Sequence, residues 1–101
     1  MATPIARRQG SGAVAETDHV ASLVVDARAG DGAAFRALLA PHLALFFRIA
    51  ARIAGPTLAE DAVQDALGIV HAKLGRYRAP ASFVGFASAI VARRAATLAR
   101  G

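Results

Sequence analysis

Apolar residues recur every three or four positions along most of this chain, and this spacing constrains its fold more than any other feature. Such a period places the apolar side chains on one face of an α-helix, whereas a half-buried strand would need alternation at every second residue. No segment alternates in that way over a useful length, and no hairpin turn is evident. The sequence therefore predicts an all-α protein, a compact helical bundle of about four helices.

Residues that start or stop helices give the expected boundaries. Asp31 and Ser82 are good N-caps, and Thr57 with Glu60 fits a capping box. Pro41 falls inside an apolar stripe and lacks a backbone N–H, so we expect a kink or break near it. The sequence predicts a first helix over 18–29 and a second from Asp31 to the Gly55–Pro56 pair, with a break within 37–42. A third helix is predicted over 57–74, with Gly75 as its C-cap, and a fourth over 82–98.

Length and composition limit the class of protein. The 101 residues are room for one core, and with 55% apolar and 19% charged residues the composition is that of a globular domain. Cysteine is absent, which excludes disulfides and thiolate metal sites. The three histidines share no ligand spacing, so we expect no metal and no other cofactor.

Residues 1–17 show no apolar period and are predicted to form a mobile N-terminal tail, which leaves residues 18–101 as the folded domain. The tail has no continuous apolar stretch of the kind found in secretory signals. The apolar run Leu43–Ile53 is shorter than a membrane span and is interrupted by Arg48 and Arg52. We therefore expect a cytoplasmic protein with no membrane partner.

The net charge of +5 is unevenly distributed along the chain. Residues 1–75 carry seven basic and seven acidic side chains, so the entire excess lies in residues 76–101, where no acid occurs. This asymmetry indicates an anionic partner, most simply nucleic acid. The alternative is a solvated basic helix end, because cations suit a helix C-terminus. The basic residues of this segment are Arg76, Arg78, Arg93, Arg94 and Arg100.

Motifs for catalysis are missing: there is no Gly-rich phosphate loop, no His-Glu-x-x-His and no serine with a base nearby. We expect no enzymatic activity and no catalytic residue. The polar residues of 57–74 form one helix face that can dock a basic partner or simply be solvated. These residues are Glu60, Asp61, Gln64 and Asp65.

The loop Arg76–Ala81 combines two arginines with Tyr77 and leads to Phe83 and Phe86. Aromatic rings can stack on unpaired bases while arginines contact phosphates. Phe83 and Phe86 are also spaced as core residues, so Tyr77 is the better candidate for a base platform.

Three segments together resemble region 2 of bacterial RNA polymerase sigma factors, of the sigma-70 family and the extracytoplasmic-function type. They are residues 27–55 (ARAGDGAAFRALLAPHLALFFRIAARIAG), 57–67 (TLAEDAVQDAL) and 74–96 (LGRYRAPASFVGFASAIVARRAA). The resemblance continues without gaps from Leu23 to Arg100. The middle segment, with its Ala-Glu-Asp-x-Val-Gln-Asp pattern, is the most specific of the three.

This resemblance implies a module of transcription initiation. The acidic face Glu60, Asp61, Gln64 and Asp65 would dock on the clamp helices of the largest subunit of core RNA polymerase. The basic end would hold the non-template single strand of the −10 promoter element. By resemblance, Tyr77, Arg78, Ser82 and Phe83 would line the base site beside Arg76, while Arg93, Arg94 and Arg100 would contact phosphates.

The last helix departs from the family pattern in the residues that read the promoter. Family members usually have tryptophan at Phe86, arginines at Ala89 and Ala92, and asparagine and aspartate at Arg93 and Thr97. We also expect the second domain, which reads the −35 element, to be missing. Both points support an alternative function, a non-initiating decoy that binds an anti-sigma factor or the polymerase clamp.

Overall fold

The computed structural model describes residues 12–78 and 82–101, and within them it contains helices and turns but no strand. The α-helices are α2 (Gly12–Arg28), α3 (Gly32–Leu39), α4 (Leu43–Ala54), α5 (Pro56–Lys73) and α6 (Phe83–Arg100). Two 3-10 turns, η1 (Ala40–His42) and η2 (Leu74–Arg76), complete the described elements. The predicted all-α bundle of about four helices is confirmed, with the predicted second helix divided into α3 and α4.

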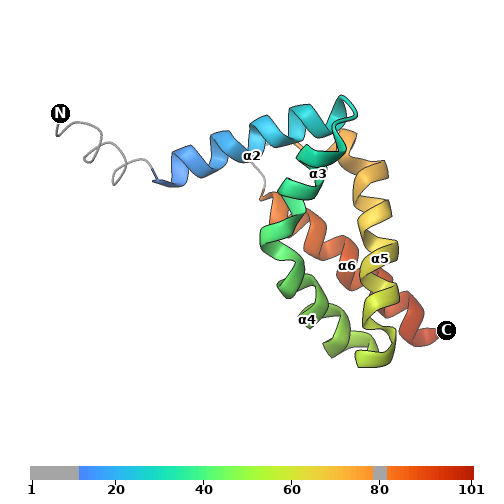
Figure 1. Cartoon of the computed structure of the whole chain (residues 1–101). Coiled ribbons are helices and arrows are strands. Elements are labelled where there is room, and N and C mark those ends of the chain that lie inside the picture. Colours follow the sequence, from blue (N-terminus) through green and yellow to red (C-terminus); the bar gives the residue numbers. More distant parts are fainter. Residues whose placement is uncertain (1–11, 79–81) are drawn as a thin grey trace, which may run out of the picture.

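Helices α4, α5 and α6 pack on one another, and α2 packs on α3 and η2 at one end of them (Figure 1). Small side chains on α5 and α6 let these helices approach closely, and large side chains fill the remaining space. Phe46, Val63, Val70 and Val91 are the largest fully buried side chains. The alanines that are buried at the contacts of α4, α5 and α6 are Ala50, Ala59, Ala62, Ala66, Ala87 and Ala95.

Two N-caps and the proline break are confirmed. The Asp31 carboxylate accepts from the backbone N–H groups of Ala33 and Ala34, at 3.0 and 3.2 Å. The Ser82 hydroxyl accepts from Gly85 N at 3.1 Å. The 3-10 turn η1 holds Pro41 and separates α3 from α4, because proline cannot supply the helical N–H.

The predicted capping box at Thr57 is wrong. Helix α5 begins one residue earlier, at Pro56, and its N-cap is Gly55 with no side-chain hydrogen bond. Proline suits the first helical position because its fixed φ is helical and no N–H partner is needed there. Gly55 has a φ of 87°, a backbone conformation that favours glycine.

Two further boundaries differ from the prediction. Helix α2 begins at Gly12, so residues 12–17 of the predicted tail are helical; extending a formed helix by one turn needs no new nucleation. Gly75 is not a left-handed C-cap but lies inside η2. Ile53, the end of the apolar run Leu43–Ile53, lies in the last turn of α4 and is 40% exposed. Residues 1–11 of the predicted tail lie outside the described residues.

Judged by length and composition alone, the stretch Gly32–Ala54 could cross a membrane, and its mean hydropathy is 1.5. Core helices of soluble proteins can have the same length and hydropathy. Here the stretch is divided by η1, and Leu38, Leu39, Phe46 and Ala50 in it are buried in the bundle.

Replacing Gly68 by alanine is expected to raise the free energy of unfolding by about 1 kcal/mol, because glycine inside a helix costs that much relative to alanine. Gly68 lies in α5, and a Cβ added there meets no atom within 4 Å. Denaturant unfolding monitored by circular dichroism measures the change. Gly55→Ala is the opposing control and should be destabilising, because its φ is positive. A loss of stability in Gly68→Ala would show that the added methyl group meets other atoms on this face of α5.

Candidate functional site

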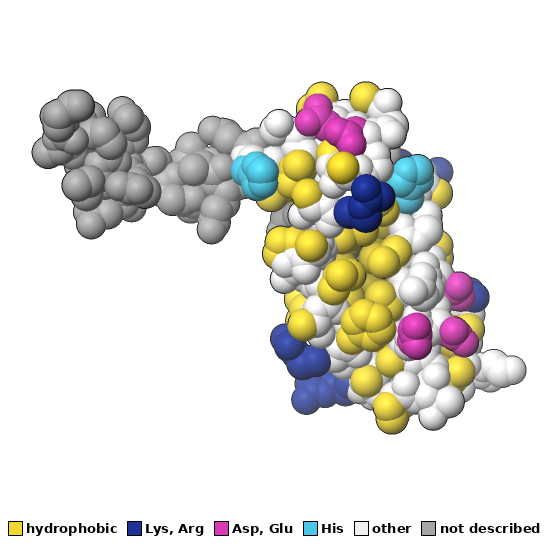
Figure 2. Space-filling view, viewed as in Figure 1, with side chains coloured by type: hydrophobic (Ala, Val, Ile, Leu, Met, Phe, Trp, Pro, Cys, Tyr) yellow, Lys and Arg dark blue, Asp and Glu magenta, His cyan; other side chains and the backbone are white. Residues whose placement is uncertain are grey.

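The predicted acidic face is present on α5. Glu60, Asp61, Gln64 and Asp65 are all exposed, and they lie on the side of α5 opposite its buried alanines and valines. Acidic side chains gather over the lower part of α5 in Figure 2, whereas basic side chains lie over the lower part of α4. The structure therefore brings the four predicted residues together on one rigid helix. Glu60 and Asp61 form no ion pair within residues 12–78 and 82–101.

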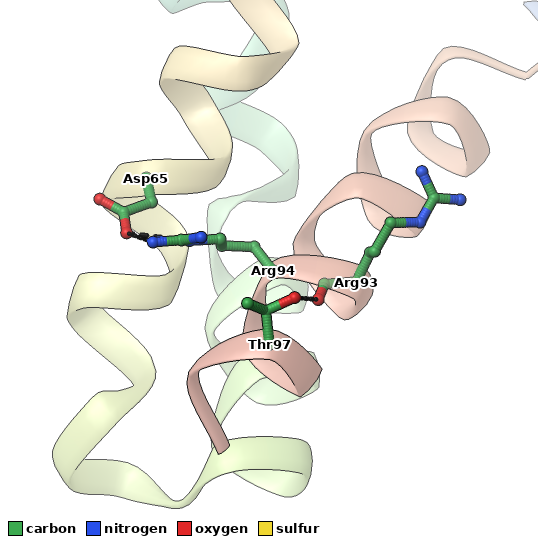
Figure 3. Close-up of polar contacts among 4 residues, drawn as sticks. All are labelled: Asp65, Arg93, Arg94 and Thr97. Atoms are coloured by element: carbon green, nitrogen blue, oxygen red, sulfur yellow. Dashed lines mark hydrogen bonds and ion pairs between the residues drawn. The ribbon is translucent and has the colours of Figure 1, made fainter. Parts of the chain in front are cut away.

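Asp65 is the member of this face that is already paired. Arg94 of α6 donates from Nε at 3.0 Å and from Nη2 at 2.9 Å to Asp65 Oδ2 (Figure 3). The side chains of Arg94 and Asp65 are 34% and 45% exposed. An ion pair as exposed as this contributes only about 0–1 kcal/mol to stability. Its importance is positional, because it joins a residue of the predicted docking face to a residue of the predicted DNA-binding set.

Arg93 and Arg100 are exposed on α6. The guanidinium of Arg93 extends away from α5, while Arg94 next to it reaches toward α5 (Figure 3). The Thr97 hydroxyl donates to the Arg93 carbonyl at 3.0 Å, a bond within the helix that leaves the Arg93 side chain free. Arg93 and Arg100 can therefore meet an anion without breaking a contact among the described residues.

The arginines near η2 differ in how available they are. Arg76 is exposed at the end of the turn. Arg78 is also exposed, but its Nη1 donates to the carbonyl of Tyr77 at 2.9 Å and to that of Gly75. Arg28 of α2 donates to the carbonyls of Leu74, at 3.1 Å, and Tyr77. Arg28 and Arg78 stabilise the turn by donating to its carbonyl groups. Arg78 of the predicted basic loop therefore has a structural role.

The expectation that Tyr77 offers an open ring is wrong. Tyr77 is 7% exposed and Phe83 is 4% exposed, and their rings meet edge to face with centroids 5.5 Å apart. Phe86 lies 5.5 Å from Tyr77 and is only partly buried. Burial of these rings against one another removes a large apolar area from water. Of the three rings, Phe86 retains the most accessible surface.

Ser82, predicted to line the base site, is exposed but serves as the N-cap of α6. Residues 79–81, which include Pro80 of the predicted loop, lie outside the described residues.

A groove between α5 and α6 was not predicted from the sequence. It has a volume of about 150 Å³ and is lined by Ile69 and Lys73 of α5 and by Ile90, Arg93, Arg94 and Thr97 of α6. Lys73 follows Ile69 by four residues and Ile69 follows Asp65 by four, a spacing that places all three on one face of α5. The contact of that face with α6 could not be deduced from spacing alone. No group of three or more metal-ligating side chains occurs within residues 12–78 and 82–101.

Comparisons of the chain with protein-family models, with curated proteins and with solved structures gave no match.

Proposed function

We propose that this chain is a cytoplasmic, non-enzymatic module of transcription initiation, similar to region 2 of sigma factors. Its acidic face would bind the clamp helices of core RNA polymerase, and its basic end would bind the non-template strand of the −10 element. The observation that carries the proposal is the separation of charge on one rigid bundle. Exposed acids gather on α5 between Glu60 and Asp65, whereas η2 and α6 carry arginines and no acid.

The acidic face supports a basic protein partner. Glu60 and Asp61 are exposed and free of ion pairs with the described residues, so no internal contact must break when a partner approaches. Charge complementarity of this kind steers association and suppresses wrong partners. Because α5 is anchored by its buried side, the backbone positions that carry these acids are fixed relative to one another.

The basic end supports a nucleic-acid partner in a more limited way than the sequence predicted. Arg76, Arg93 and Arg100 are available to phosphates, which supply affinity and position the strand. Capture of an unpaired base would have to use the open surface of Phe86 or displace Tyr77 from its packing. Such displacement would offset part of the stacking energy, which is roughly 1–3 kcal/mol per base.

The burial of Tyr77 and Phe83 favours a second candidate function. A module that keeps the acidic docking face but holds its aromatic rings in the core can bind the polymerase clamp or an anti-sigma factor without opening DNA. Such a decoy needs only the first half of α5.

Reversing the charge of Asp61 is expected to weaken capture of the chain by core RNA polymerase by at least about tenfold, because the clamp partner would then meet a like charge. Co-purification of the Asp61→Arg variant with core polymerase measures the loss. Asp26→Arg is the matched control: Asp26 is exposed on α2, outside the acidic face, and should leave capture unchanged. Equal capture of the wild type and the Asp61→Arg variant would remove the acidic face from the proposal.

The two candidate functions differ in binding to a single-stranded −10 oligonucleotide, measured against a scrambled sequence. Arg93→Gln tests this surface better than Tyr77→Ala, which would also remove a buried ring. Initiation predicts a preference for the −10 sequence and weaker binding by Arg93→Gln. Capture by polymerase without any oligonucleotide binding would leave only the decoy. Binding to neither would contradict both functions.

A further inference from the structure

The groove between α5 and α6 gathers positive charge over an apolar floor. Lys73, Arg93 and Arg94 line it together with the side chains of Ile69 and Ile90, and the Arg93 guanidinium itself extends away from α5 (Figure 3). Among the described residues no acid lines it, and Asp65, outside the lining, holds Arg94. Ile90 is buried and Ile69 and Lys73 are partly buried, so charges here interact through a medium less polar than bulk water.

The donors of Arg94 are only partly used. A guanidinium carries five N–H donors, and Asp65 Oδ2 accepts from Nε and Nη2 alone. The Nη1 group and the second Nη2 hydrogen remain for another acceptor. Lys73 has three donors and no ion pair among the described residues. Lys73 on α5 and Arg94 on α6 therefore line the groove from its two walls, and each has donors left for an anion.

We propose that this groove binds a phosphate group of a nucleic-acid backbone, with Lys73 and Arg94 as its ligands, Arg93 at its rim and Asp65 as an internal competitor for Arg94. The volume of about 150 Å³ is many times the roughly 10–15 Å³ that one water molecule needs, so a phosphate and its bound water fit. Arginine and lysine are the side chains that bind phosphate through charge-assisted hydrogen bonds. The identity of the phosphate as nucleic acid rests on the proposed function.

This arrangement couples the groove to the acidic face. While Asp65 accepts from Nε and Nη2, Arg94 has only Nη1 and one Nη2 hydrogen left for a phosphate; without Asp65 it can also offer Nε and Nη2 as a two-point contact. A basic partner that takes the Asp65 carboxylate releases Arg94 to the groove. By reciprocity, a phosphate that takes Arg94 releases Asp65 to the partner.

Removing the Lys73 charge tests the groove directly. We expect Lys73→Gln to weaken binding of a fluorescein-labelled octathymidylate by roughly fivefold, with a salt-dependence slope smaller in magnitude by about 0.7, the value for one phosphate contact on a single strand. Fluorescence anisotropy over a salt series measures both quantities. Arg52→Gln, an exposed cation on α4, is the matched control and should change the affinity less than twofold. Equal losses in the two variants would show diffuse attraction and overturn the site.

Removing the competitor should have the opposite effect. Asp65→Asn is expected to tighten octathymidylate binding by about threefold more than Asp26→Asn, which makes the same change of charge at an exposed position of α2 that neither lines the groove nor pairs with Arg94. Equal effects of these two variants would overturn the role of Asp65. A second probe, inorganic pyrophosphate, is titrated into ¹⁵N-labelled protein while the Arg94 Nε signal is followed. If pyrophosphate shifts this signal and the octathymidylate does not, the groove binds small phosphates and the nucleic-acid assignment is wrong.

The failure of this inference can be told from the failure of the proposed function. Binding to octathymidylate that depends on Lys73, without any preference for the −10 sequence, would support the groove and contradict initiation. If the chain prefers the −10 sequence and is captured by polymerase, but Lys73→Gln and Asp65→Asn do not change octathymidylate binding, initiation is supported and the phosphate site in the groove is refuted.

Discussion

Replacing Phe46 by alanine is expected to lower the free energy of unfolding by about 3–5 kcal/mol. Phe46 is 0% exposed and is the only aromatic side chain among the largest fully buried ones; the others are valines. Removing the ring from this fully buried position leaves a cavity, and the cost of that cavity adds to the lost burial energy. Since small domains have only about 5–15 kcal/mol of stability, this change should bring the chain close to unfolding.

Phe47→Ala is the matched control, because Phe47 follows Phe46 in α4 and is 39% exposed. We expect that variant to lose about 1 kcal/mol or less, since most surface substitutions have small effects. Denaturant unfolding followed by circular dichroism compares the two. Similar losses in both variants would mean that α4 does not present the face to the bundle that the structure shows.

Introducing a carboxylate at Ala62 is expected to destabilise the chain by about 4 kcal/mol or more at neutral pH, because the position is 0% exposed and offers no partner charge. Burial raises the pKa of the introduced carboxyl above that of an unfolded aspartate. The penalty is therefore present above the unfolded pKa and diminishes as the pH falls and the group is protonated in both states. Unfolding of Ala62→Asp and wild type at pH 7 and pH 4 measures the difference.

Two variants separate charge from packing at this position. Ala62→Asn has nearly the same shape but no charge, and its deficit should be smaller and independent of pH. Gln64→Asp adds a carboxylate to the exposed side of the same helix and should change stability by about 0.5 kcal/mol or less. A deficit in Ala62→Asp that does not shrink at low pH would refute burial of the carboxylate as its cause.

Local physical rules were enough to predict most of the fold. The apolar period depends only on helix geometry, and Asp31, Pro41 and Ser82 act on backbone groups within a few residues of themselves. The capping box predicted at Thr57 is absent because two local preferences competed there. Pro56 is favourable at the first helical position, and its preference shifted the helix start by one residue.

The candidate site was predicted less well, because its geometry depends on contacts between distant residues. The acidic face needed only the spacing within α5 and was placed as expected. Tyr77 was placed wrongly, since its partners Phe83 and Phe86 come from the next helix. The Asp65–Arg94 pair and the inclusion of Lys73 in a groove follow from the way α5 lies on α6, which no pattern within either segment reveals.

The alanine-lined contacts of α5 have a consequence for how such a protein can evolve. Ala59, Ala62 and Ala66 leave no room for larger side chains, so drift at these positions is strongly restricted. The acidic positions between them project outward and can change without disturbing the packing. Selection can therefore alter what this surface recognises while the bundle stays the same.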